Sequence, residues 1–162
     1  MKIATIIGAR PQFIKASSVS RRIKKINTFS EIIIHTGQHF EWNMSDVFFE
    51  EMDIPNADYN LDINNVNHTL MINKMYDSLK PILLKEKIKG IIVYGDTNST
   101  LAGSLAASDM GIPIFHVEAG LRSFDRAMLE EKNRIITDHL SDLLFCPTPN
   151  SVKNLSNENI SK

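Results

Sequence analysis

Short runs of isoleucine and valine alternate along this chain with longer amphipathic runs, and this alternation limits the possible folds more than any other feature. The apolar runs cover residues 2–7, 31–36, 90–94, 112–117 and 142–146. Short apolar runs bounded by glycine, proline or aspartate are typical of strands buried on both faces. The longer runs predict helices over residues 11–26, 42–52, 68–86, 98–110 and 129–140. Strands that alternate with helices predict an α/β fold, a doubly wound parallel sheet of the Rossmann-like kind.

The length of 162 residues is enough for one domain with its own core. We expect residues 1–150 to form that domain, with a short additional strand over residues 59–63. Residues 151–162 are polar, and they are expected to be a tail or the start of an interdomain linker. We expect the last part of this segment, residues 154–162, to be frayed.

Charge and cysteine content exclude several classes of protein. The net charge of −1 gives no electrostatic basis for binding nucleic acid or an anionic membrane. No apolar run approaches the roughly 20 residues that a membrane-spanning helix needs. Cys146 is the only cysteine, so no intramolecular disulfide is possible. These features fit a protein of the reducing cytoplasm.

Polar side chains follow four of the predicted strands, at the point where each strand ends. Ligands of open α/β sheets bind beyond the carboxyl ends of the strands, so these residues are expected to converge on one site. They are Arg10 after the first strand, Gln38 and His39 after the second, Asp96 after the third, and His116, Glu118 and Arg122 at the end of the fourth. The alternative for Asp96 is a capping role at the helix that follows it.

The residue types restrict the chemistry of this site. The sequence has no Gly-x-Gly-x-x-Gly fingerprint, no P-loop lysine and no metal-ligand spacing among its histidines. Carboxylates that face a cleft suit proton abstraction and donation, and arginines near helix N-termini suit a diphosphate. The carboxylates are Asp96, Glu118, Glu130 and Glu131, and the arginines are Arg10, Arg122 and Arg134. Glu130, Glu131 and Arg134 are also spaced as ion pairs on a helix surface.

Five long motifs carry a resemblance to a known family. "IIGARPQFIK", "HTGQH", "VYGDTNSTLAG", "HVEAGLRSFD" and "EEKNRIITDHLSDLLFCPT" together resemble the non-hydrolysing UDP-N-acetylglucosamine 2-epimerases, from Met1 to about Pro149. The family has two Rossmann-like domains of the glycosyltransferase-B type, with the active site between them. The chain resembles the first domain only. The resemblance implies that a second domain, on the same or another polypeptide, supplies most nucleotide contacts, and that the complete enzyme is a homodimer.

The resemblance also implies roles for single residues. Asp96 and Glu118 match carboxylates that act in acid/base catalysis, and so does one of the pair Glu130 and Glu131, of which the first matches better. Arg10 matches an arginine that contacts the nucleotide, with Lys15 on the same opening turn, and the loop residues His39 and Arg122 are further candidates for substrate binding. Gln38 matches a residue of the regulatory site of bacterial members.

Some positions depart from the family pattern. Leu129 replaces the usual proline before the glutamate pair. Glu41 and Asn67 replace a glutamine and an arginine of the regulatory site, so regulation by substrate is not predicted. The motifs "ARPQFIK" and "SFD" are closer to the motifs of the branch that acts in capsule and O-antigen sugar pathways. That branch includes enzymes for diacetamido-uronic acid nucleotides, so the sugar is left open.

The implied reaction inverts carbon 2 of UDP-N-acetylglucosamine to give UDP-N-acetylmannosamine, for cell-surface polysaccharide synthesis. It proceeds by elimination and re-addition of UDP, and it needs no NAD, metal or other cofactor. Two alternatives belong to other classes. One is a glycosyltransferase-like or hydrolysing relative, which would release free sugar and would not epimerise. The other is a non-catalytic or split-gene fragment that folds but has only half of the site.

Overall fold

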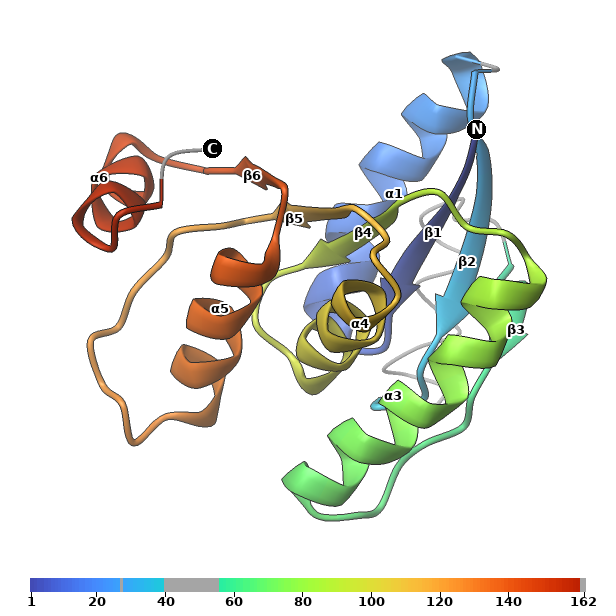
Figure 1. Cartoon of the computed structure of the whole chain (residues 1–162), viewed down its shortest axis with the longest axis horizontal. Helices are drawn as coiled ribbons and strands as arrows, with labels where there is room; N and C mark the ends of the chain where they lie inside the picture. Colours follow the sequence, from blue (N-terminus) through green and yellow to red (C-terminus); the bar gives the residue numbers. More distant parts are fainter. Residues whose placement is uncertain (27, 40–55, 161–162) are drawn as a thin grey trace.

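The computed structural model describes residues 1–26, 28–39 and 56–160, and it contains one parallel β-sheet flanked by helices (Figure 1). The strand order is β3-β2-β1-β4-β5-β6, and every pair of neighbours runs parallel. The strands are β1 (Lys2–Ile7), β2 (Ser30–His35), β3 (Tyr59–Asn60), β4 (Ile91–Tyr94), β5 (Ile114–Val117) and β6 (Leu143–Phe145). The predicted doubly wound parallel sheet is therefore confirmed.

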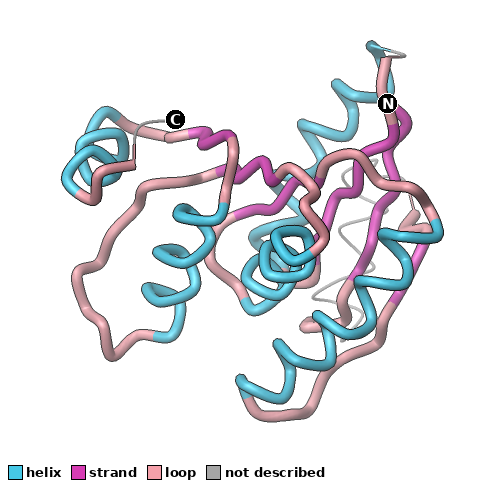
Figure 2. The backbone as a smooth tube through the Cα atoms, viewed as in Figure 1, coloured by secondary structure: helices cyan, strands magenta, loops and turns pink. Residues whose placement is uncertain are grey.

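Helices cover both faces of the sheet. They are α1 (Arg10–Ile26), α3 (His68–Lys85), α4 (Asn98–Asp109), α5 (Leu129–Leu140) and α6 (Pro149–Asn157). In Figure 1, α3, α4 and α5 lie side by side in front of the sheet, and α1 lies behind it. The tube in Figure 2 shows the strands as a single layer between these helices. The helix predicted over residues 42–52 lies outside the described residues.

The core consists of two apolar clusters, one on each face. On the α1 face, Phe13 and Ile23 pack against Ile3, Ile7 and Ile92 of the sheet. On the opposite face α4 is the central helix, and it can be buried on nearly all sides because its residues are small. A Cβ atom on Gly103 of α4 would lie 2.9 Å from Cδ1 of Ile6, closer than such atoms approach. Glycine thus lets α4 lie directly on the sheet.

The expectation that residues 154–162 are frayed is wrong for the part that forms α6. Thr148 caps this helix by accepting the N–H of Ser151 at 3.1 Å, and Pro149 occupies the first turn. The inner face of α6 buries Ser151, Asn154 and Leu155. The helix was missed because this inner face is mostly polar. That residues 151–162 lead into an interdomain linker remains a prediction.

The strand order reverses between β1 and β4. The chain moves from β1 to β2 and β3 on one side, and β4, β5 and β6 follow on the other side. Loops that leave two neighbouring strands in opposite directions open a crevice at the carboxyl edge of a doubly wound sheet. Here that crevice lies between Gly8, which follows β1, and Gly95, which follows β4.

Candidate active site at the carboxyl edge

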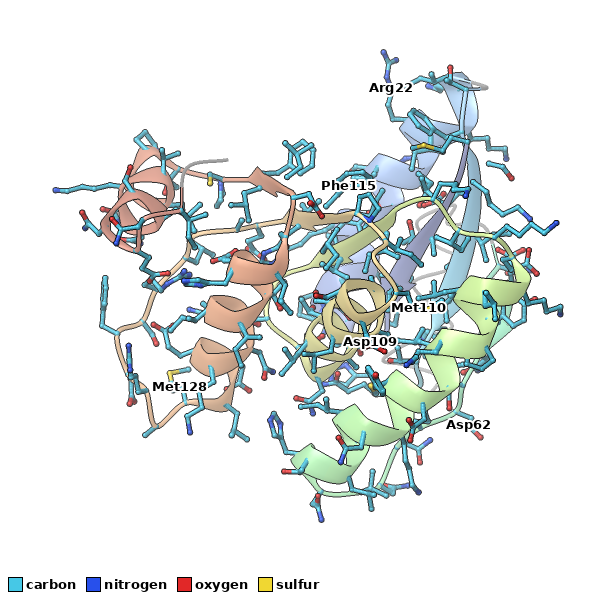
Figure 3. All side chains as sticks on the ribbon, viewed as in Figure 1. Arg22, Asp62, Asp109, Met110, Phe115 and Met128 are labelled. Atoms are coloured by element: carbon cyan, nitrogen blue, oxygen red, sulfur yellow. The ribbon has the colours of Figure 1, made fainter. Side chains whose placement is uncertain are left out.

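A cavity of about 400 Å³ lies at the carboxyl edge of the sheet, beside this crevice. Residues at the starts of α1, α3, α4 and α5 line it, together with the loop after β2. The lining residues are Ala9, Pro11, Gln38, His39, His68, Asp96, Thr97, Asn98, Leu129, Glu130 and Asn133. Figure 3 labels Asp62 and Met128 at this edge and Arg22 at the opposite end of the molecule. Because helix N-termini carry partial positive charge, the cavity favours an anionic group.

Asp96 lies in the turn that joins β4 to α4. Gly95 adopts φ +63°, a left-handed conformation that glycine accepts readily. Thr97, and not Asp96, caps α4, because its hydroxyl accepts the N–H of Thr100 at 3.3 Å. The capping alternative for Asp96 therefore does not hold. Its carboxylate instead forms an ion pair with Arg134 of α5.

Glu118 follows β5 and lies on the other side of the same turn. Its carboxylate forms an ion pair with Lys15 of α1. A Cβ atom on Gly95 would lie 3.2 Å from Oε2 of Glu118, which shows how closely this carboxylate approaches the residue before Asp96. Glu118 has φ +74°, a conformation that costs a non-glycine residue about 1–3 kcal/mol. The backbone N–H groups of Glu118 and Ala119 both donate to the Phe145 carbonyl, at 3.0 and 3.1 Å, and hold it there.

The two neighbouring glutamates of α5, Glu130 and Glu131, lie in different surroundings, one at the cavity and one buried. Glu130 is exposed and lines the cavity. Glu131 is only 1% exposed and accepts the backbone N–H groups of Ser123 and Phe124, both at 2.9 Å. Burial alone would raise the pKa of Glu131, but these two hydrogen bonds, helped by the charge of Arg134, hold the pKa below its usual value. Glu131 is thus an ionised anchor for the loop before α5, and Glu130 is the member of the pair that faces the cavity.

Gln38 and His39 contact the first turns of two helices. The Gln38 side-chain oxygen accepts the backbone N–H of Ser99 at 3.2 Å and its hydroxyl at 2.9 Å, at the start of α4. Nδ1 of His39 accepts the backbone N–H of Arg10 at 3.0 Å, at the start of α1. Burial lowers the pKa of His39, which favours the neutral ring that can accept this bond. The Arg10 side chain is exposed at the same helix start.

The Arg122 side chain lies away from the cavity. Only 1% of it is exposed, and it donates to both carboxylate oxygens of Glu158, each at 2.6 Å, and to Asp138 at 2.7 Å. The structure thus engages Arg122 in a buried network between α5 and α6. A role for Arg122 in binding substrate remains a prediction.

The sequence reasoning did not single out two residues of α5 near the site, Asn133 and Asp138. Asn133 donates to the backbone carbonyl of Asp96 at 3.0 Å. Arg134, which the sequence offers as a cation for a diphosphate or as a partner in a helix-surface ion pair, pairs with the Asp96 carboxylate. A carboxylate oxygen of Asp138 lies 2.7 Å from Nδ1 of His116, which the sequence places among the polar residues of the carboxyl edge or, alternatively, as a buried neutral ring. The available signal was the spacing of polar residues along α5. Arg134 and Asp138 are four residues apart, about one helical turn, and Asn133 directly precedes Arg134.

A second cavity, of about 500 Å³, offers no such chemistry. It lies on the α1 side of the sheet, and its lining is apolar throughout: Met1, Ile3, Val19, Ile23, Phe29, Ile92, Phe115, Val117, Leu143 and Phe145. Across residues 1–26, 28–39 and 56–160, no three histidine, cysteine, aspartate or glutamate side chains are grouped so that they could hold a metal ion. In the same part of the chain, no helix is both long and apolar enough to cross a membrane.

The fold and the polar carboxyl-edge cavity define the chain as a Rossmann-like α/β domain of the glycosyltransferase-B type. The family model described as UDP-N-acetylglucosamine 2-epimerase matches residues 21–162, and the chain belongs to this family of isomerases. A similar fold at 12% identity and a TM-score of 0.66 occurs in MurG of Acinetobacter baumannii, which bears on the fold alone.

Individual members of the epimerase family are more similar in sequence to this chain than MurG is. The UDP-2,3-diacetamido-2,3-dideoxy-D-glucuronate 2-epimerase of Pseudomonas aeruginosa is 58% identical over 98% of this chain and 45% of its own length. The crystal structure of UDP-GlcNAc 2-epimerase of Methanocaldococcus jannaschii, in complex with UDP-GlcNAc and UDP, matches with a TM-score of 0.97 at 48% identity. That match covers 99% of this chain and 44% of that one. The chain thus spans somewhat less than half the length of the relatives it matches.

Proposed function

We propose that this chain provides the carboxylate-bearing half of an enzyme that inverts carbon 2 of a UDP-2-acetamido sugar. The observation that carries the proposal is the approach of two carboxylates from different strands to one turn. Asp96 follows Gly95 in the chain, and Oε2 of Glu118 lies next to Gly95. Inversion needs a proton removed from one face of the carbon and another delivered to the opposite face, so it needs two acid/base groups.

The proposed reaction breaks and restores two bonds. A carboxylate takes the proton from carbon 2, the electron pair forms the double bond between carbons 1 and 2, and the bond from carbon 1 to the diphosphate oxygen breaks. UDP leaves, and a 2-acetamidoglucal remains. UDP then adds back to carbon 1 while carbon 2 takes a proton on the opposite face. Glu130, which faces the cavity, is a third candidate for proton transfer.

The same cavity suits the leaving group. The first turns of α1, α3, α4 and α5 surround it, and the partial positive charge of these helix N-termini favours a negatively charged oxygen. Arg10 lies at the first of these turns and supplies a cation. Stabilising the diphosphate as it departs lowers the barrier to elimination more than it strengthens ground-state binding.

Two sugars compete as the substrate. UDP-N-acetylglucosamine is the molecule named for the M. jannaschii relative, which is 48% identical. The relative at 58% identity is named for a UDP-2,3-diacetamido-glucuronate. UDP-N-acetylglucosamine is the first candidate. The 58% identity is the observation that supports the diacetamido-uronate as a second candidate. Both reactions invert carbon 2, so the roles of Asp96 and Glu118 are the same for either sugar.

The test follows deuterium from heavy water into carbon 2 of each UDP-sugar. Residues 1–162 are assayed alone and after joining to the second half of the P. aeruginosa relative, a hybrid that we call the completed enzyme. We expect exchange in the completed enzyme and none above background in residues 1–162 alone, because the relatives are more than twice as long. Release of free sugar without exchange into the UDP-sugar would show hydrolysis instead. Full exchange by residues 1–162 alone would show that the second half is dispensable.

A further inference from the structure

His116 is a buried histidine whose two ring nitrogens both face hydrogen-bond acceptors. The side chain is 0% exposed and belongs to β5. Nδ1 lies 2.7 Å from a carboxylate oxygen of Asp138, and Nε2 lies 2.7 Å from the backbone carbonyl oxygen of Gly95. A backbone carbonyl has no proton to give, so Nε2 must be the donor in that contact.

Asp138 is in the ionised form that accepts at the other nitrogen. It receives the backbone N–H of Gly120 at 3.1 Å and a guanidinium N–H of Arg122 at 2.7 Å, besides the contact from His116. Both of these donors, the Gly120 N–H and the guanidinium of Arg122, which is always charged, favour the ionised carboxylate independently of His116. An ionised carboxylate is an acceptor only, so Nδ1 of His116 also donates. The ring therefore carries two protons.

This buried pair contacts the backbone on both sides of the candidate catalytic carboxylates. His116 holds the carbonyl of Gly95, directly before Asp96. Asp138 holds the N–H of Gly120, two residues after Glu118. Glu118 adopts φ +74° between these fixed points, a conformation that the surroundings must enforce.

We propose that His116, doubly protonated and paired with Asp138, is a positioning residue that sets the spacing between Asp96 and Glu118. The proposal rests on the function proposed above and adds two residues to it. Neither residue lines the cavity, and both act through the backbone of the turn and of the loop after β5. The contact that matters for Asp96 is the one from Nε2 of His116 to Gly95.

Two substitutions separate the two contacts of the ring. In His116→Gln the terminal amide nitrogen occupies the place of Nε2 and retains a donor toward Gly95. In His116→Asn the shorter amide retains a donor toward Asp138 and leaves the Gly95 carbonyl without one. His139→Gln, on the exposed last turn of α5, is the matched control. A merely structural role through the Asp138 pair would make His116→Asn the milder change, and the positioning role makes His116→Gln the milder change.

The first measurement is nuclear magnetic resonance on residues 1–162. We expect both ring nitrogens of His116 to show the chemical shifts of protonated nitrogens at neutral pH. The amide nitrogen of Asp96, which reports a hydrogen bond to the preceding carbonyl, should shift in His116→Asn and stay in place in His116→Gln and His139→Gln. A single ring proton, or equal shifts in both His116 variants, would overturn the proposal. Melting curves confirm that each variant is folded.

The second measurement is turnover of the completed enzyme. A displacement of about 1 Å in a reacting group costs on the order of 10²-fold in rate. We expect a loss of that size in kcat for His116→Asn, with little change in KM, and a smaller loss for His116→Gln. If the unsubstituted enzyme exchanges no deuterium at carbon 2, the proposed function fails, while the resonance experiment still decides the role of His116. Equal kcat in the two His116 variants would contradict the positioning role.

Discussion

Replacing Asp96 with asparagine should separate catalysis from stability. The Asp96–Arg134 ion pair is partly exposed, with 31% of one side chain and 14% of the other open to solvent. Arg134 also keeps a second carboxylate, Glu131, at 3.0 Å, so Asp96→Asn leaves no unpaired buried charge. Loss of such a pair costs about 1 kcal/mol or less, which lowers the melting temperature of a domain of this size by roughly 2–4 °C. Loss of a proton-transfer group costs about 10²–10⁴-fold in turnover.

Glu131→Gln is the matched control on the same ion-pair network. Glu131 is 1% exposed and accepts two backbone N–H groups as well as Arg134. Arg134 keeps Asp96 in this variant, but the two backbone N–H groups lose a buried charged acceptor, and hydrogen bonds to charged groups are worth about 1.5–3 kcal/mol each, so the variant should lose more stability than Asp96→Asn. The assay pairs a thermal melt with deuterium exchange at carbon 2 in the completed enzyme. Near-normal exchange in Asp96→Asn, or a melting loss as large as that of Glu131→Gln, would refute the reasoning.

Three further substitutions test other parts of the molecule. Arg10→Ala, at the exposed start of α1, should weaken UDP binding measured by calorimetry and leave the melting temperature nearly unchanged; the reverse pattern would indicate a structural role. Burial raises the pKa of Glu31, although hydrogen bonds from Thr5 and Ser20 act in the opposite direction. The folded state therefore binds a proton on Glu31 more tightly than the unfolded state does, and stability is lost as the pH rises above the ordinary pKa of 4.5. Glu31→Gln should therefore raise the melting temperature at about pH 7 and change it little at about pH 4, and equal effects at both would contradict this. Gly120→Ala forces a side chain into φ +76° against the Ser151 carbonyl, and urea unfolding should show a loss of about 1–3 kcal/mol; no loss would mean that α6 shifts freely.

The sheet could be predicted because its residues carry one unambiguous signal. Strands such as Ile91–Tyr94 are apolar at every position, and only burial on both faces suits them. α6 lacked that signal, since its buried residues include Ser151 and Asn154, whose hydrogen bonds replace apolar packing. Thr148 and Pro149 nevertheless form a recognisable helix start.

In the site, the positions fixed by the topology of the sheet could be predicted from the sequence, and those that depend on side-chain packing could not. The place of Asp96 followed from the end of a strand, because the carboxyl edge of a parallel sheet is fixed by topology. The difference between Glu130 and Glu131 did not follow, because neighbouring helix residues point about 100° apart and only the packing of α5 decides which one faces the cavity. Arg122 shows the same limit, since its place after a strand does not reveal that Asp138 and Glu158 enclose its side chain.

The contacts of α6 bear on where this folding unit can be cut. Glu158 neutralises Arg122, Arg122 neutralises part of Asp138, and Asp138 holds His116, so charges of alternating sign connect α6 to the turn beside Asp96. A polypeptide that stops at residue 150 would keep the whole sheet and leave the guanidinium of Arg122 buried with one partner fewer. An arginine in that condition draws in water or turns outward. We therefore expect the independent folding unit to be set by charge balance as well as by the sheet, and to extend at least to Glu158.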